Sequence, residues 1–156
     1  MNPFIKKIQR ATLAAAALLM IGSAQAAAPI YSPDGVAIKG YDTVAYFLDG
    51  KPVRGSDTYV TEWKGAKWKF VSQDHLDKFK AEPAKYAPQY GGYCAYGTSL
   101  GHLAPTEPDA WAVIDGKLYL NYNQNVRAKW SQNVAGYNAA ANAQFEGLLK
   151  GPAESE

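Results

Sequence analysis

One pattern, a strand followed by a turn and a second strand, occurs twice in this chain and narrows its possible folds. The clearer copy joins residues 110–114 to residues 117–122 through Asp115 and Gly116. An Asp-Gly pair favours the tight turn of a two-residue β-hairpin, because both positions of that turn need positive φ. The other copy is built from strands at Tyr59–Trp63 and Lys67–Val71 around a turn at 64–66. Both copies predict antiparallel pairing.

Helical signals surround these hairpins. Ser72 is a good N-cap and predicts a helix over Gln73–Ala81, which the following Pro83 limits. A second short helical piece is predicted over Pro83–Tyr86. Within Gly40–Leu48 the apolar residues indicate one more short element, with Asp42 able to cap its first turn.

The last predicted element is a long amphipathic helix that begins near Asn123. Gly136 is a position where it could bend or split. Apolar residues recur there at steps of three and four: Val126, Trp130, Val134, Tyr137, Ala141, Phe145 and Leu148. We therefore predict a single small α+β domain, with two antiparallel β-hairpins packed against short helices and the long C-terminal helix. Strands do not alternate singly with helices, which argues against a doubly wound parallel sheet.

The N-terminus has the pattern of a cleavable secretory signal. Three basic residues precede an apolar stretch from Ala11 to Gly22, and small residues then suit a cut after Ala26. We expect residues 1–26 to be this signal, residues 27–150 to form the domain, and residues 151–156 to be a frayed tail. A cleaved signal would place the mature protein in the periplasm, without stable membrane insertion.

Charge excludes some partners. The predicted signal carries three of the 16 basic residues and none of the 14 acidic ones, so the remaining domain is nearly neutral. No basic patch is left to indicate nucleic acid, and we expect no nucleic-acid partner. The partner that we expect is a periplasmic protein of unknown identity or a metal ion.

The single cysteine is the main candidate for chemistry. Cys94 lies in the run Tyr90-Gly-Gly-Tyr-Cys-Ala-Tyr-Gly97 and has no second cysteine in the chain to pair with. In an exported protein such a thiol is either a reactive thiolate or soft-metal ligand, or a small buried core residue. From the residues alone both interpretations remain open.

Four stretches, residues 40–47, 80–95, 104–111 and 115–122, carry a family resemblance. They include Gly40-Tyr-Asp-Thr-Val-Ala-Tyr-Phe47 and the run that ends in Tyr90-Gly-Gly-Tyr-Cys-Ala95. In these motifs the chain resembles the exported YHS-domain proteins of Gram-negative bacteria, some of which are selenoproteins. The resemblance covers most of residues 38–135.

The resemblance implies a metal or redox role. Shorter YHS modules occur in copper-transporting ATPases and often carry the pair F-C-S-x-x-C, which is associated with metal. Here Val71 stands in place of the first cysteine and His75 in place of the second, so that two-thiolate site is absent. Some exported relatives have selenocysteine where this chain has Cys94, which suits redox or soft-metal chemistry.

Two histidines complete the candidate metal set. His102 follows Gly101, and a turn there could bring it back towards Cys94. His75 lies beside the apolar stripe of its helix. Each histidine has a plainer interpretation, as a surface residue for His102 and as a core residue bonded to backbone for His75. Tyr41, Asp42 and Tyr93 are predicted to border a pocket, although a framework role is the alternative for the tyrosines.

The function that we predict is a metal-binding or redox-linked module centred on Cys94. Copper(I) is the favoured metal because thiolate and imidazole are its candidate ligands, and another transition metal such as zinc is an alternative. The alternative function is a non-catalytic interaction or small-ligand domain with a structural cysteine. No paired carboxylates or catalytic motifs favour an enzyme, and we expect neither nucleotide nor haem.

Overall fold

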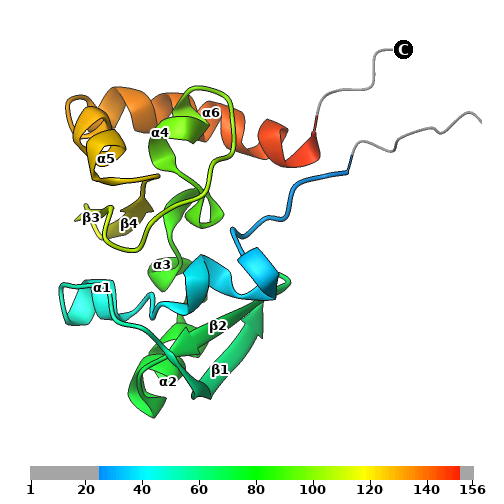
Figure 1. Ribbon diagram of the computed structural model, residues 1–156, viewed down its shortest axis with the longest axis vertical. Coiled ribbons are helices and arrows are strands. Elements are labelled where there is room, and N and C mark those ends of the chain that lie inside the picture. Colours follow the sequence, from blue (N-terminus) through cyan, green and yellow to red (C-terminus); the bar gives the residue numbers. More distant parts are fainter. Residues whose placement is uncertain (1–24, 152–156) are drawn as a thin grey trace, which may run out of the picture.

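The chain folds into two lobes that are stacked along its longest axis (Figure 1). The computed structural model describes residues 25–151. The first lobe contains α1 (Ala45–Leu48), β1 (Ser56–Trp63), β2 (Ala66–Phe70) and α2 (Gln73–Ala81). The second contains α4 (Ala95–Ser99), β3 (Trp111–Ile114), β4 (Lys117–Leu120), α5 (Gln124–Trp130) and α6 (Val134–Lys150). Short pieces complete the chain: η1 (Pro33–Gly35), η2 (Ala37–Gly40), α3 (Pro83–Tyr86) and η3 (Gln89–Gly92).

Both predicted hairpins form, each as a separate two-stranded antiparallel sheet. In the first hairpin Trp63 pairs with Ala66, and Lys64 and Gly65 make the turn with φ of 48° and 76°. In the second hairpin Asp115 and Gly116 adopt φ of 51° and 73°. Both turns thus have two successive positive φ angles, as the type I′ geometry requires.

The first lobe is held by a cluster of aromatic rings beneath its hairpin. Phe79 from α2 lies 4.9 Å from the Trp68 ring and 5.0 Å from the Phe70 ring, measured between centroids. Trp63 packs edge-on against the same Phe79 ring. The helix that presents Phe79 has the predicted bounds, and the Ser72 side chain accepts a hydrogen bond from the His75 N–H as its N-cap.

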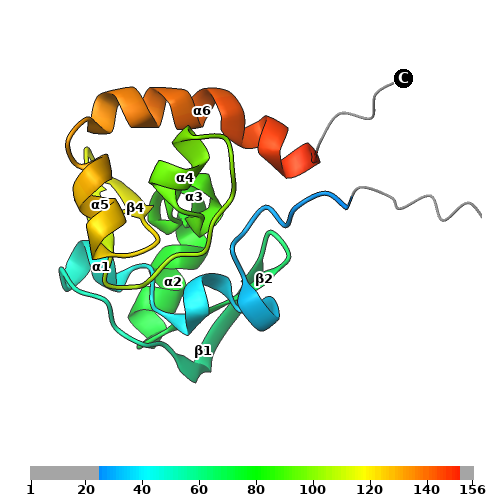
Figure 2. The same ribbon diagram turned by 45° about the horizontal axis from the view of Figure 1, so that its top comes forward.

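The second lobe packs β3, β4, η3 and α4 against the two C-terminal helices. Its buried centre is formed by Tyr90, Ala95, Tyr119, Trp130 and Ala141. Figure 2 shows α6 lying across the outside of this lobe with α4 beneath it. A smaller cluster of Ile38, Tyr46, Leu118 and Leu120 joins the lobes through η2, α1 and β4.

The predicted long C-terminal helix forms, and it is split near Gly136, where a bend or split was expected. The helix is split between Trp130 and Val134, and Asn133 caps the start of α6 by accepting a hydrogen bond from the Gly136 N–H. A Cβ on Gly136 would stand only 2.4 Å from the Asn133 amide nitrogen. Gly136 therefore makes room for the cap of a new helix, and the break lies before this glycine rather than at it.

The observed architecture confirms the predicted α+β class. Mixed helices and two antiparallel hairpins form one small domain with a long C-terminal helix. Most of the predicted signal and most of the predicted tail lie outside the described residues, so the structure does not test them. Among residues 25–151, no helix is both long and apolar enough to span a bilayer.

Replacing Phe79 with alanine is expected to destabilise the protein by about 3–5 kcal/mol, the usual cost of emptying a core aromatic site. Phe79 is only 1% exposed and contacts three other rings of the first lobe. Urea denaturation followed by tryptophan fluorescence measures the change. The control is Leu100→Ala, at a side chain 56% exposed, which should change stability by less than about 0.5 kcal/mol.

Candidate functional site

Cys94 lies at the entrance to α4, where it acts as the N-cap residue. Its Sγ accepts a hydrogen bond from the Gly97 N–H at 3.3 Å, and its own N–H donates to the Ala104 carbonyl at 3.0 Å. The residue is 1% exposed. The thiol is therefore buried, and its sulfur already has one backbone donor.

A buried asparagine faces the thiol from the end of β4. Asn121 Oδ1 accepts a hydrogen bond from the Tyr96 N–H at 3.2 Å and lies 3.7 Å from Cys94 Sγ, which can donate to it. Asn121 is fully buried, yet its Nδ2 has no hydrogen-bond partner in the described part of the chain. Because an unpaired buried donor costs free energy, this amide marks the surroundings of Cys94 as incompletely satisfied.

His102 lies back against α4. Gly101 turns the chain with φ of 90°, and the His102 N–H then donates to the Gly97 carbonyl at 3.1 Å. The imidazole is exposed, and its Nε2 lies 3.3 Å from the place that a Cβ on Gly97 would occupy. The Cys94 thiol and the His102 imidazole thus both lie against Gly97.

His75 lies in the first lobe, on α2, and pairs with Asp42. Its Nδ1 donates to Asp42 Oδ2 at 2.7 Å, because a carboxylate oxygen can only accept. The same carboxylate also accepts hydrogen bonds from the backbone N–H groups of Val44, Ala45 and Val71. Asp42 is fully buried. The pair therefore ties three segments of the first lobe together.

The structure does not bring the three predicted metal ligands into one site. α2 and α4 lie in different lobes (Figure 1). Residues 25–151 hold no group of three or more His, Cys, Asp or Glu side chains placed to share a metal ion. Cys94 and His102 remain together at Gly97, whereas His75 is used by Asp42.

The other predicted pocket residues act mainly as framework. The Tyr41 ring lies under the Arg54 guanidinium, whose carbon is 5.0 Å from the ring centroid. The Asp42 carboxylate is already hydrogen-bonded to His75 and to three backbone N–H groups. The Tyr93 hydroxyl donates to the Ala28 carbonyl at 2.9 Å, and burial raises the pKa of this phenol above its usual value. Tyr93 therefore stays a protonated donor. None of the three lines the cleft described below.

Comparison with known families identifies part of the chain. Residues 44–90 match the family model described as the YHS domain. The chain thus contains a segment that matches the YHS domain, which supports the coarse part of the predicted resemblance. The YHS domain is a family to which metal binding has been ascribed. Neither the curated proteins nor the solved structures gave a match to the chain.

The matched segment corresponds to the first lobe and the connection out of it. It begins just before α1 and ends within η3 at Tyr90. His75 lies inside the match, whereas Cys94 and His102 follow it. In the sequence, Cys94 was indicated as a candidate by its lack of a partner cysteine. His102 was indicated by the glycine that precedes it, which could turn the chain back. No sequence signal pointed to Asn121, which lies 27 residues from the thiol that it faces.

Replacing Asp42 with alanine is expected to cost at least about 3 kcal/mol, because the backbone donors and His75 Nδ1 would all lose their acceptor inside the protein. Asp42→Asn keeps one acceptor oxygen and should lose about half as much. Chemical denaturation of both variants measures these changes. A loss below about 1 kcal/mol for Asp42→Ala would contradict the central place of this carboxylate.

Proposed function

We propose that this YHS-domain protein is a periplasmic copper(I)-binding module, with Cys94 and His102 as its metal donors. The supporting observation is the position of Gly97. Its N–H donates to Cys94 Sγ, and the His102 imidazole rests where its side chain would be. A soft sulfur and an imidazole nitrogen thus both lie beside Gly97.

The number of donors favours copper(I) over zinc. Structural zinc sites almost always use four ligands, and catalytic ones use three protein ligands and a water. The described residues offer no such group. Soft thiolate ligands suit both copper(I) and zinc, and it is the shortage of further donors that favours copper(I). A site with two donors suits a metal that is bound and then passed to a partner.

The residues around Cys94 are compatible with a metal-bound sulfur. The Gly97 N–H points at Sγ, and hydrogen bonds of this kind orient and tune metal ligands. Asn121 contributes a further amide donor that has no partner within residues 25–151. Because the thiol is 1% exposed, the residues that cover it must move for a metal to enter.

Copper(I) titration against a chromogenic chelator, under reducing conditions without oxygen, tests the proposal. Cys94→Ser keeps the N-cap, because serine is itself a good capping residue, but removes the soft ligand. We expect this variant to lose affinity by about 100-fold or more. His102→Gln and Gly97→Ala should each lose about 10-fold, the lower end of the range for disturbed metal sites.

Gly97→Ala is the sharpest of these variants. Its Cβ would meet His102 Nε2, the His102 carbonyl oxygen and the Ala104 Cβ at 3.3 Å, so His102 and Ala104 must give way by a few tenths of an ångström. Alanine is a better helix former than glycine, and α4 itself should therefore persist. Equal copper(I) affinity for the native protein and Cys94→Ser would sink the proposal. Unchanged affinity in both His102→Gln and Gly97→Ala would exclude His102 as a donor.

A second candidate function is supported by the burial of the thiol. With Cys94 1% exposed and hydrogen-bonded, the residue is also consistent with a structural role in a non-catalytic interaction or small-ligand module. A redox enzyme is less well supported, because a one-cysteine reaction needs a resolving thiol from another molecule. The chain has only one cysteine.

Thiol labelling separates a structural Cys94 from an accessible one. For a purely structural residue, labelling of the folded protein by a disulfide reagent should be at least about 1,000-fold slower than in urea, because it must await opening. If Cys94 is purely structural, copper(I) should not slow its labelling. Labelling of the folded protein at the rate of a free thiol would contradict the structural role.

A further inference from the structure

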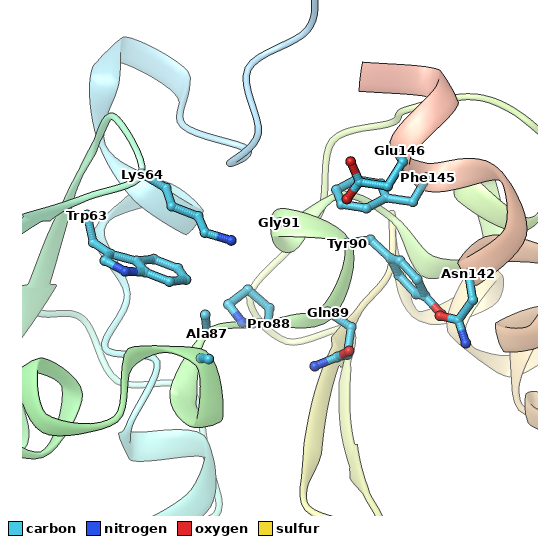
Figure 3. A pocket seen from close by; sticks show the side chains of 11 residues that line it. Trp63, Lys64, Ala87, Pro88, Gln89, Tyr90, Gly91, Asn142, Phe145 and Glu146 are labelled. Carbon is cyan, nitrogen blue, oxygen red and sulfur yellow. The ribbon is translucent and has the colours of Figure 1, made fainter. Parts of the chain in front are cut away.

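A cleft of about 290 Å³ opens between the hairpin turn of the first lobe and α6 of the second. Trp63 and Lys64 form one wall, and Asn142, Phe145 and Glu146 form the other (Figure 3). The segment Ala87–Gly91 lines the space between them. A second hollow of about 260 Å³ shares most of these residues and extends the cleft to Pro29, Ile30 and Leu149.

Opposite charges face this space from its two walls. In Figure 3 the ammonium group of Lys64 and the carboxylate of Glu146 point towards the cleft from opposite sides. Within residues 25–151 neither group takes part in an ion pair. Lys64 instead lies over the Trp63 ring, with Nζ 4.7 Å from the ring centroid. The cleft thus presents one cation and one anion, both available to a ligand.

The walls and the segment between them are held in place before any ligand arrives. The Tyr90 hydroxyl donates to Asn142 Oδ1 at 3.0 Å, which joins η3 to α6, and burial raises the pKa of this phenol. Tyr90 has φ of 56°, a left-handed conformation that costs a non-glycine residue about 1–3 kcal/mol. Such strain persists only where surrounding contacts enforce it. The tight hairpin turn fixes the backbone of Lys64.

We propose that this cleft binds a small zwitterion, a molecule of amino-acid to dipeptide size with a free carboxylate, a free ammonium group and an apolar or aromatic body. Lys64 would receive the carboxylate and Glu146 the ammonium group. Trp63 and Phe145 offer aromatic surface to the apolar body. The volume lies at the lower end of the range for small-molecule pockets, which is about 300–1,000 Å³.

The paired charges also exclude simpler ligands. A purely anionic molecule would meet the Glu146 carboxylate, and a purely cationic one would meet Lys64. An uncharged apolar molecule would leave both charges partly desolvated without a partner, which is unfavourable. The inference is independent of copper binding, since neither Cys94 nor His102 lines the cleft. The inference supplies a ligand class, the small zwitterion, for the second candidate function, which is that of a non-catalytic small-ligand module.

Calorimetric titration of the full mature chain with the dipeptide Ala-Phe tests this inference. The comparison ligands are N-acetyl-Ala-Phe, which lacks the ammonium group, and Ala-Phe-amide, which lacks the carboxylate. Each blocked peptide should bind about 5- to 10-fold more weakly than Ala-Phe. Lys64→Gln should abolish the preference for the free carboxylate, and Glu146→Gln the preference for the free amine.

Lys51→Gln and Glu62→Gln are matched controls. They remove the same charges from exposed residues that do not line the cleft, and they should leave all three affinities unchanged. No measurable binding of Ala-Phe, equal binding of the three peptides, or equal effects of control and cleft variants would each overturn the inference. The same titration with Cys94→Ser keeps this result separate from copper binding, because that variant should bind Ala-Phe normally.

Discussion

The first lobe depends on one buried carboxylate. Asp42 accepts hydrogen bonds from the start of α1, from Val71 at the end of β2, and from His75 on α2. Its neighbour Thr43 donates to the Tyr86 carbonyl and so adds α3 to the same assembly. These elements carry the aromatic core of the lobe, and their relative positions therefore rest on a polar centre. A buried carboxylate is tolerated there only because its oxygens are so fully bonded.

Local signals predicted local structure well. Ser72 capped the helix that it was expected to cap, and both turn sequences formed hairpins, because caps and tight turns are decided by neighbouring residues. The apolar period continues across the split of the C-terminal helix, and only Gly136 indicated from the sequence that the helix could bend or split there. Asn133 begins a second helix at a position where periodicity alone predicts continuation. The capping hydrogen bond of Asn133 therefore decided where the second helix begins, and the apolar periodicity did not.

The candidate site was only partly predictable for the same physical reason. Cys94 and His102 are eight residues apart, and a glycine turn between them suffices to bring them to Gly97. Asn121 reaches the thiol only because β4 ends beside α4, which is a tertiary contact. His75 and Asp42 are 33 residues apart, and no pattern in the sequence links them. Sequence indicated which side chains carry chemistry, whereas packing decided which of them meet.

The division into lobes separates two possible activities. Every hydrogen bond made by Cys94 goes to the second lobe or its loops, namely to Gly97, Thr98, Ala104 and Asn121. The cleft instead takes one wall from each lobe, and its floor is the segment that connects them. The shape of the cleft therefore depends on how the lobes are set against each other, whereas the surroundings of Cys94 do not depend on it.

The YHS match ends within that connecting segment, at Tyr90. The matched segment thus supplies the hairpin wall, and the chain that follows it supplies both Cys94 and α6, which forms the opposing wall.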